Sequence, residues 1–217
     1  MSAPAPVPDR DCGQCPRLVA YREEHRAAEP KWHNAPVPSF GSPDARLLIV
    51  GLAPGLRGAN RTGRPFTGDF AGDLLYATLS QFGFARGTYG AKTSDGLALY
   101  DCRITNAVRC VPPQNQPVAA EIAACRAFLT AEIEAMSRLH AILALGLVAH
   151  GAVLKALGVR VGACRFAHGA VHRLEDGRQL FDSYHCSRLN TNTGRLTPAM
   201  FADVFTAIRD ELGEVRT

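Results

Sequence analysis

Residues 46–69 read RLLIVGLAPGLRGANRTGRPFTGD and place a short apolar segment directly before a long polar loop. Residues 46–50 are apolar after Arg46 and bounded by Gly51, which is typical of a buried strand. The loop that follows holds five glycines and three arginines. Glycine lets a backbone approach a ligand closely, so we expect this loop to carry function. It lacks the Gly-Lys-Ser/Thr of a phosphate-binding loop, which excludes nucleotide hydrolysis of that type.

Similar apolar segments elsewhere predict the remaining strands, at 102–108, 141–145 and 180–184. Apolar residues at helical spacing predict helices at 73–82, 118–139 and 147–157, and a last helix with Thr197 as N-cap and Gly213 after its end. Strands that alternate with helices indicate a parallel sheet. The expected fold class is therefore α/β, a three-layer α/β/α sandwich around a central, mostly parallel four-stranded sheet. We expect a single domain over residues 1–217, with residues 1–10 flexible.

The composition is that of a globular chain and excludes a membrane protein. Hydrophobic residues make up 47% of the 217 residues, and the longest apolar run, near 142–148, is far shorter than the ~20 residues of a spanning helix. The N-terminus lacks the basic and apolar regions of a signal peptide, which predicts a cytoplasmic location of the bacterial type. No apolar stripe is expected on the surface, which favours a monomer without a membrane partner. The net charge of +4 alone is weak support for nucleic-acid binding.

Seven cysteines in a chain of this kind favour metal ligands or free thiols over a disulfide framework. Cys12 and Cys15 form a C-x2-C pair, while Cys110 and Cys125 lie far along the chain. A strand-end thiol at Cys110 and a core residue at Cys125 are the alternative interpretation. Two thiolates two residues apart can chelate one metal, and a second pair completes a four-ligand site. Zinc and a 4Fe-4S cluster fit this spacing equally well.

Polar residues that could take part in catalysis or binding follow the predicted strands. Asp69 and Asp73 lie where a helix begins, and either could be a carboxylate that only stabilises the helix N-terminus. Asn106, at the end of a predicted strand, could form hydrogen bonds to an amide-like edge of a ligand. His185 begins a polar run with two arginines that is typical of a nucleic-acid contact, although a structural histidine and a solvated loop would look the same. Because ligands of open α/β sheets bind at the carboxyl ends of strands, we expect these loops to converge.

These loops resemble the motifs of the iron-sulfur uracil-DNA glycosylases, most closely family 5, the type B enzymes. The matching segments are GLAP at 51–54, NRTGR at 60–64, FTGD at 66–69, TNAVRC at 105–110, and Asn190 followed by TGRLT at 193–197. The resemblance as a whole covers most of the chain. Family 4 typically has an acidic residue where this chain has Leu52. The third motif of the family usually begins His-Pro-Ser, whereas this chain has Cys186 after His185, so a rigid proline is missing and a thiol is expected near the DNA.

The resemblance implies a monofunctional DNA glycosylase that hydrolyses the N-glycosidic bond of uracil, and of other deaminated bases such as hypoxanthine and xanthine, to initiate base excision repair. It also implies a 4Fe-4S cluster with a structural role on Cys12, Cys15, Cys110 and Cys125. No lysine lies in the motifs, so a Schiff-base mechanism lacks its nucleophile. The implied partner is DNA that contains deaminated bases.

The resemblance also implies roles for individual residues. By analogy with glycoside hydrolysis, Asp69 would stabilise the oxocarbenium-like sugar or direct water, with Asp73 as the other candidate. His185 and the loop backbone would stabilise the departing base. The residues implied in base binding are Gly51, Leu52, Ala53, Pro54, Phe66, which would stack on the base, and Asn106, which would bond to its edge. Those implied in DNA binding are Arg61, Arg64, Arg188, Asn190 and Arg195.

An alternative from another class is a noncatalytic nucleic-acid-binding module whose cysteines hold zinc. Asp69 separates the two interpretations, because a module that only binds DNA has no use for a carboxylate near the sugar. Replacing Asp69 would abolish turnover only in a glycosylase. A small electron carrier is disfavoured by the polar loops.

Overall fold

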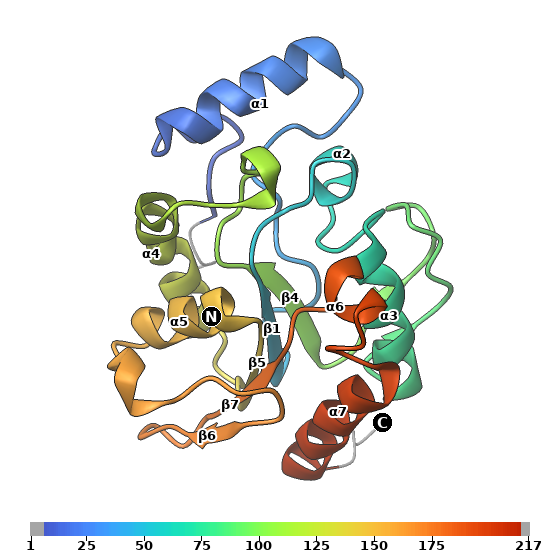
Figure 1. Ribbon diagram of the computed structural model, residues 1–217, viewed down its shortest axis with the longest axis vertical. Coiled ribbons are helices and arrows are strands. Elements are labelled where there is room, and N and C mark those ends of the chain that lie inside the picture. The colour runs from blue at the N-terminus through green and yellow to red at the C-terminus, as the bar shows by residue number, and fades with distance from the viewer. Residues whose placement is uncertain (1–6, 214–217) are drawn as a thin grey trace.

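The computed structural model describes residues 7–213, and its main sheet has five strands in the order β4-β1-β5-β7-β6 (Figure 1). The strands are β1 (Leu47–Gly51), β4 (Cys102–Asn106), β5 (Ala141–Leu145), β6 (Val171–Arg173) and β7 (Gln179–Ser183). All neighbours pair in parallel except β6, which runs antiparallel to β7 at the edge. The predicted α/β class and mostly parallel sheet are confirmed, but the count of four strands was wrong. The fifth strand, β6, is short and mostly exposed, so no apolar run marks it.

Helices surround the sheet, and short elements connect them. The helices are α1 (Pro16–Ala28), α2 (Ala59–Thr62), α3 (Phe70–Gln81), α4 (Ala119–Ala135), α5 (Leu147–Ala156), α6 (Arg188–Asn192) and α7 (Pro198–Leu212). Two single turns, η1 (Pro113–Asn115) and η2 (Val161–Ala163), and a small antiparallel pair, β2 (Ala85–Arg86) with β3 (Ala98–Leu99), complete the described elements. No helix among residues 7–213 is long and apolar enough to cross a membrane. The prediction of flexibility for residues 1–10 falls, as far as residue 6, outside the described residues.

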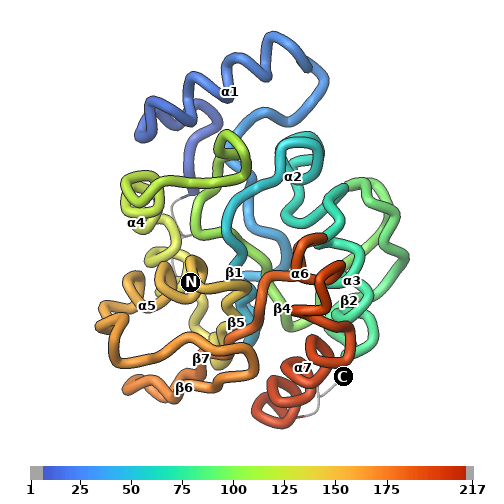
Figure 2. Tube along the Cα trace, in the orientation of Figure 1, coloured from blue at the N-terminus to red at the C-terminus, as the bar shows by residue number. Residues whose placement is uncertain are grey.

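The sheet buries both faces because side chains alternate along each strand. In β1, Leu47 and Ile49 join a core cluster with residues of α3 and α7, whereas Leu48 and Val50 join a second cluster with residues of α4 and α5. The tube in Figure 2 shows these two helix pairs on opposite sides of the sheet. The three-layer arrangement expected from the sequence is therefore present.

Three helices, α1, α2 and α6, were not predicted, and each has a physical reason. Helix α2 is a single turn of four residues inside the glycine-rich loop and is too short to show apolar periodicity. Helix α1 begins at Pro16 and buries only Leu18 and Arg22, so its sequence carries almost no apolar periodicity. Helix α6 is a single short turn capped by Ser187, whose Oγ accepts from the Asn190 N–H at 3.4 Å. The polar segment expected to be a loop is thus partly helical.

The topology brings three loops to one edge of the sheet. β1, β4 and β7 all run in the same direction, so the segments after Gly51, Asn106 and Ser183 leave the sheet on the same side. Helix α3 begins at Phe70, three residues before the predicted start, which makes Asp69 its N-cap residue. This edge is where the polar motifs meet.

Candidate active site

A cavity of ≈ 280 Å³ opens at the carboxyl ends of the parallel strands, and all three motif loops line it. The lining residues singled out from the sequence are Leu52, Ala53, Pro54, Phe66, Asp69, Asn106, His185 and Arg188. The others, which sequence reasoning missed, are Gly55, Ala59, Phe70, Ala71, Asn115 and Ser187. Asn115 lies in η1 with φ of +57°, between the motif cysteines. Only its place in a Pro- and Gln-rich loop between Cys110 and Cys125 could have drawn attention to it.

Asp69 occupies the N-cap position of α3, but its side chain makes no capping hydrogen bond. Its Oδ2 instead accepts from the Ala59 N–H at 3.3 Å, across the loop. Burial raises the pKa of Asp69, while the Ala59 N–H and the charge of Arg61 oppose that rise. A structural N-cap carboxylate would bond to its own helix. The geometry therefore favours a carboxylate that serves the cavity, whereas Asp73 is exposed and does not line it.

Glycines in the loop make room for the side chains around the cavity. A Cβ at Gly58 would lie 1.9 Å from Cγ of Asp69, a distance that no real packing allows. A Cβ at Gly51 would lie 2.6 Å from Cζ of Phe66 and 2.4 Å from Oδ1 of Asn106. Gly51 is thus not a lining residue but the spacer that admits two of them.

Phe66 has a backbone φ of +54°, in the left-handed region that aromatic residues rarely adopt. Its carbonyl accepts from the Tyr89 hydroxyl at 3.2 Å, and that hydroxyl accepts from the Gly68 N–H at 3.1 Å. Its ring stacks on His185, with centroids 6.0 Å apart and planes inclined by 29°. Strained backbone held by several contacts is typical of functional sites.

Asn106 ends β4 with only 3% of its surface exposed. Its Oδ1 has no hydrogen-bond partner within the described part of the chain. Leaving a buried polar atom unpaired costs free energy, so such an atom beside a cavity is suited to a ligand donor.

His185 follows β7 and lies beside Phe66 at the cavity. Burial lowers the pKa of His185 to about 4, so the imidazole is neutral near pH 7. Its carbonyl accepts from Nδ2 of Asn190 at 2.8 Å, so Asn190 braces the backbone of this motif. Cys186 is fully buried in the core, and burial raises the pKa of its thiol to about 12. The expectation of a thiol near the DNA was therefore wrong.

Three of the predicted DNA-binding arginines are exposed, and one of them, Arg188, lines the cavity. Arg188 lies over the Phe70 ring, 5.1 Å from its centroid, and Arg195 lies over Tyr184 at 4.6 Å. Arg61 is exposed on α2. Stacking on aromatic rings leaves the guanidinium donors free for phosphate.

Arg64 departs from the prediction because it is only 5% exposed. Its guanidinium forms a forked pair with Asp95, with N–O distances of 2.9 and 2.6 Å, and it packs over the Phe40 and Tyr76 rings. Its Nε also donates to Thr67 at 2.7 Å. The structure contradicts the predicted DNA contact of Arg64, because its donors are occupied inside the protein. The residue holds the loop that carries Phe66 and Asp69.

The four motif cysteines line a second cavity, under α1. Sγ of Cys125 accepts from the Arg109 N–H at 3.4 Å, and Sγ of Cys110 lies 3.9 Å from Nη1 of Arg22. Burial raises the pKa of both thiols, that of Cys110 to about 12. All are free thiols. Four sulfur donors around one space, two of them already accepting N–H bonds, fit a site for an iron–sulfur cluster or for zinc.

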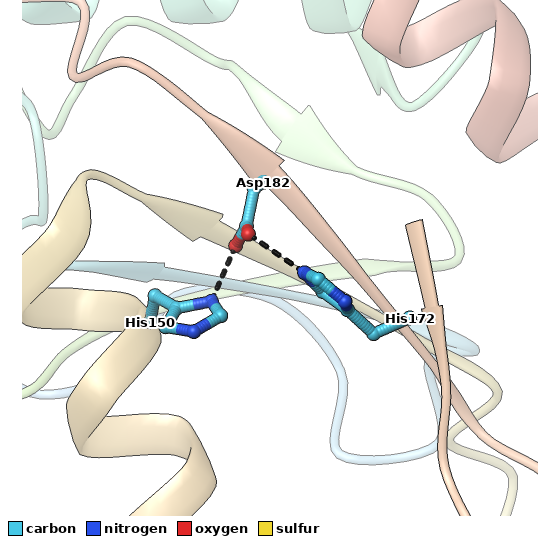
Figure 3. A group of neighbouring side chains, drawn as sticks. All are labelled: His150, His172 and Asp182. Carbon is cyan, nitrogen blue, oxygen red and sulfur yellow. Dashed lines mark hydrogen bonds and ion pairs between the residues drawn. The ribbon is translucent and has the colours of Figure 1, made fainter. Parts of the chain in front are cut away.

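A separate group of titratable side chains joins α5 to the edge of the sheet (Figure 3). Asp182 is fully buried in β7, and its two carboxylate oxygens lie 2.7 Å from Nδ1 of His150 and 3.0 Å from Nε2 of His172. Nε2 of His150 also lies 3.0 Å from the Cys164 carbonyl. Each ring nitrogen of His150 thus has an oxygen of another residue within hydrogen-bond distance. We interpret the group as a hydrogen-bonded network.

Known proteins with similar sequences bear on this site. The family model described as "Uracil DNA glycosylase superfamily" matches residues 38–209. A "Type-5 uracil-DNA glycosylase" of Thermus thermophilus is 47% identical over 89% of this chain and 90% of its own length, and one of Mycobacterium leprae is 47% identical over 89% and 88%. A "Type-4 uracil-DNA glycosylase" of Pyrobaculum aerophilum is 36% identical over 70% of this chain and 63% of its own length.

The fold and the site define an α/β protein with a ligand cavity at the carboxyl ends of its parallel strands, walled by an acid, a histidine and an aromatic ring. The chain belongs to the uracil-DNA glycosylase superfamily and, within it, to the type-5 family. The resemblance found in the sequence motifs is thereby confirmed.

Proposed function

We propose that this protein is a monofunctional DNA glycosylase that removes uracil, and other deaminated bases such as hypoxanthine and xanthine, from DNA. The observation that carries the proposal is Asp69, whose carboxylate leaves its own helix uncapped and lies in a cavity walled by Phe66, Asn106 and His185. Nothing in the comparisons favours the noncatalytic zinc module. We further propose that the chain acts as one domain and a monomer in the cytoplasm.

The reaction generates positive charge on the sugar and negative charge on the departing base. Asp69 would stand beside the sugar, where a carboxylate stabilises the cation or orients water. Its single N–H contact, from Ala59, leaves the other carboxylate oxygen free. Burial raises its pKa because it disfavours the ionised carboxylate. Positive charge that develops on the sugar would stabilise this ionised form.

The base would lie against Phe66, with its edge towards Asn106. The unpaired Oδ1 of Asn106 would accept from an N–H of the base. His185, neutral because of its low pKa, would donate an N–H to a base carbonyl on which charge develops. Leu52 and Ala53 line the same cavity, and their backbone N–H groups would add to that stabilisation.

The cavity of the described chain has no lysine in its lining, which supports hydrolysis without strand cleavage. Base extrusion costs a few kcal/mol and is easiest for mispaired bases, which favours deaminated bases as substrates. Arg61, Arg188 and Arg195 would hold the phosphates of the opened duplex, since all three are exposed.

We also propose that Cys12, Cys15, Cys110 and Cys125 hold a 4Fe-4S cluster. When bound, such a cluster would supply a rigid cross-link and no step of the hydrolysis. The four residues join the segment before α1 to the end of the β4 loop and to α4. Purified protein should contain iron and sulfide and absorb visible light, and Cys125→Ser should lose both, whereas zinc without iron would refute the cluster.

The experiment that tests the activity is incubation with duplexes that contain uracil, hypoxanthine or xanthine, followed by alkaline cleavage at abasic sites. Wild type should produce abasic sites, and Asp69→Asn should reduce the rate about 10²–10⁴-fold, the range for a positioned acid–base group. Asp73→Asn is the matched control and should retain activity. Unchanged activity in Asp69→Asn would remove it from the chemistry.

A further inference from the structure

A groove beside the catalytic loop is unused by the proposed reaction. It has a volume of ≈ 420 Å³ and is called the Trp32 groove here, with the lining residues His25, Ala28, Glu29, Trp32, Leu56, Arg57 and Arg61. Trp32 is the only tryptophan of the chain and is partly exposed. The groove thus combines a large aromatic face with two exposed arginines.

The groove and the active-site cavity lie on the two sides of one segment. Gly55 and Ala59 line the cavity, whereas Leu56, Arg57 and Arg61 line the groove. The charge of Arg61 also lowers the pKa of Asp69, so its guanidinium is close enough to influence the carboxylate. A chain that leaves the cavity across this segment would meet the groove.

Hydrogen bonds fix Trp32 next to the arginines. The backbone N–H of Trp32 donates to the Glu29 carbonyl at 3.0 Å. The backbone N–H of the next residue, His33, donates to the Arg61 carbonyl at 3.1 Å. The buried pair Asn34 and Asn60 joins the same two segments, with Nδ2 of Asn60 donating to Oδ1 of Asn34 at 2.9 Å. The aromatic wall is therefore attached to α2 and does not depend on a free loop.

The charges of the groove favour an anion. Neither Arg57 nor Arg61 forms an ion pair with an acidic side chain anywhere in residues 7–213, and Glu29 is the single acidic residue in the lining. Free guanidinium groups beside a partly exposed tryptophan match the two parts of a nucleotide, its phosphate and its base.

We propose that the Trp32 groove is a subsite for an unpaired nucleotide of the DNA strand that flanks the extruded base, with the base stacked on Trp32 and the phosphates held by Arg57 and Arg61. The inference rests on DNA being the substrate, as proposed above. It adds a contact outside the cavity that grips single-stranded or locally opened DNA.

Because Trp32 is the sole tryptophan, its fluorescence reports on the groove directly. Titration of the whole protein with a short oligothymidylate without uracil should quench this fluorescence saturably, and added salt should reverse the quenching. By anisotropy of a labelled oligothymidylate, Trp32→Leu should bind about 5- to 150-fold more weakly, the loss of one base–aromatic stack, and Trp32→Phe should retain most of the affinity. Arg57→Ala should make the salt dependence shallower by about 0.7, the contribution of one phosphate contact. Arg160→Ala, an exposed arginine that lines neither cavity nor groove, should change neither quantity.

The outcomes separate this inference from the proposed function. If oligothymidylate leaves the fluorescence unchanged while uracil is still released, the subsite is refuted and the glycosylase stands. If thymidine monophosphate quenches as tightly as the oligonucleotide, the groove binds free nucleotides and not a DNA strand, which also overturns the proposal. Saturable quenching without any base release would support the subsite and refute the glycosylase. In turnover assays, Trp32→Leu should raise KM for single-stranded uracil DNA with little change in kcat.

Discussion

Phe66 and His185 stack on each other, although 118 residues separate them in the sequence and they follow different strands of the sheet. Phe66 comes from the loop after β1 and His185 from the loop after β7, with β5 between the two strands. The stack joins a residue proposed to hold the base with one proposed to receive its charge. A change in either ring therefore alters the wall of the same cavity.

Replacing Phe66 tests this wall. Phe66→Leu keeps an apolar side chain but loses the aromatic face. The resulting fall in kcat/KM on uracil DNA should correspond to about 1–3 kcal/mol of lost transition-state stabilisation, the value of a base–aromatic stack. Phe66→Tyr keeps the face and should retain most activity. Steady-state kinetics measure the effect, and a Phe66→Leu variant as active as wild type would show that the ring does not contact the base.

The glycines around Asp69 predict a steric effect on activity. Gly58→Ala would place a Cβ 1.9 Å from Cγ of Asp69, which forces the carboxylate or the loop to move. Activity should fall by about as much as in Asp69→Asn. Gly162→Ala, where a Cβ meets nothing within 4 Å, is the matched control and should behave as wild type in the same abasic-site assay. Equal activity of the two variants would mean that the position of Asp69 does not matter.

The buried carboxylate of Asp69 predicts a trade between stability and function. Folding raises its pKa, so the folded state binds this proton more tightly than the unfolded state does, and the group destabilises the fold as pH rises above about 4. Asn cannot ionise, so Asp69→Asn should unfold at a higher temperature than wild type at pH 7, with the difference shrinking at low pH. Calorimetry across this range checks the sign. The exposed Asp73→Asn should show little difference.

His185 predicts a pH effect in the opposite direction. Folding lowers its pKa from about 6.5 to about 4, so the unfolded state binds the proton more readily. The neutral ring is fully tolerated above pH 6.5, and stability is lost as pH falls from about 6.5 to about 4. As pH falls through this window, the free energy of unfolding of His185→Gln should decrease by about 1–3 kcal/mol less than that of wild type. Urea unfolding at several pH values would measure it, and parallel curves would contradict the low pKa.

The sequence predicted the main features of the fold because they rest on buried apolar runs. The four long strands and helices α3, α4, α5 and α7 have clear periodicity, and the structure confirms them within a few residues. Helix α1 escaped prediction because its contacts are polar. Its Arg22, for example, is buried and donates to the Cys12 carbonyl at 3.1 Å. Such long-range polar pairing leaves no local pattern in the sequence.

The candidate site was predicted well where a motif fixes a local conformation and poorly where tertiary contacts decide. Asp69, Phe66 and His185 lie at the cavity as the motifs imply. Arg64 belongs to the same motif, yet Asp95 turns it inward from a segment that carries no motif. The orientation of an arginine depends on its partner, and the sequence alone does not pair residues that lie far apart along the chain.

The network around Asp182 gives a last prediction, about stability. Its carboxylate is fully buried, and its two oxygens lie within hydrogen-bond distance of His150 and His172. Asp182→Asn would replace one of the two acceptor oxygens by an amide NH2 group that faces a histidine ring. Leaving a buried polar group without its hydrogen bond costs about 1–3 kcal/mol, so the urea midpoint should fall. Asp203→Asn, on the exposed face of α7, is the control and should leave the midpoint unchanged. Because β7 leads directly into His185, Asp182→Asn should also lower kcat at urea concentrations at which the protein is still folded. A folded Asp182→Asn of wild-type stability would show that the network does not support the sheet edge.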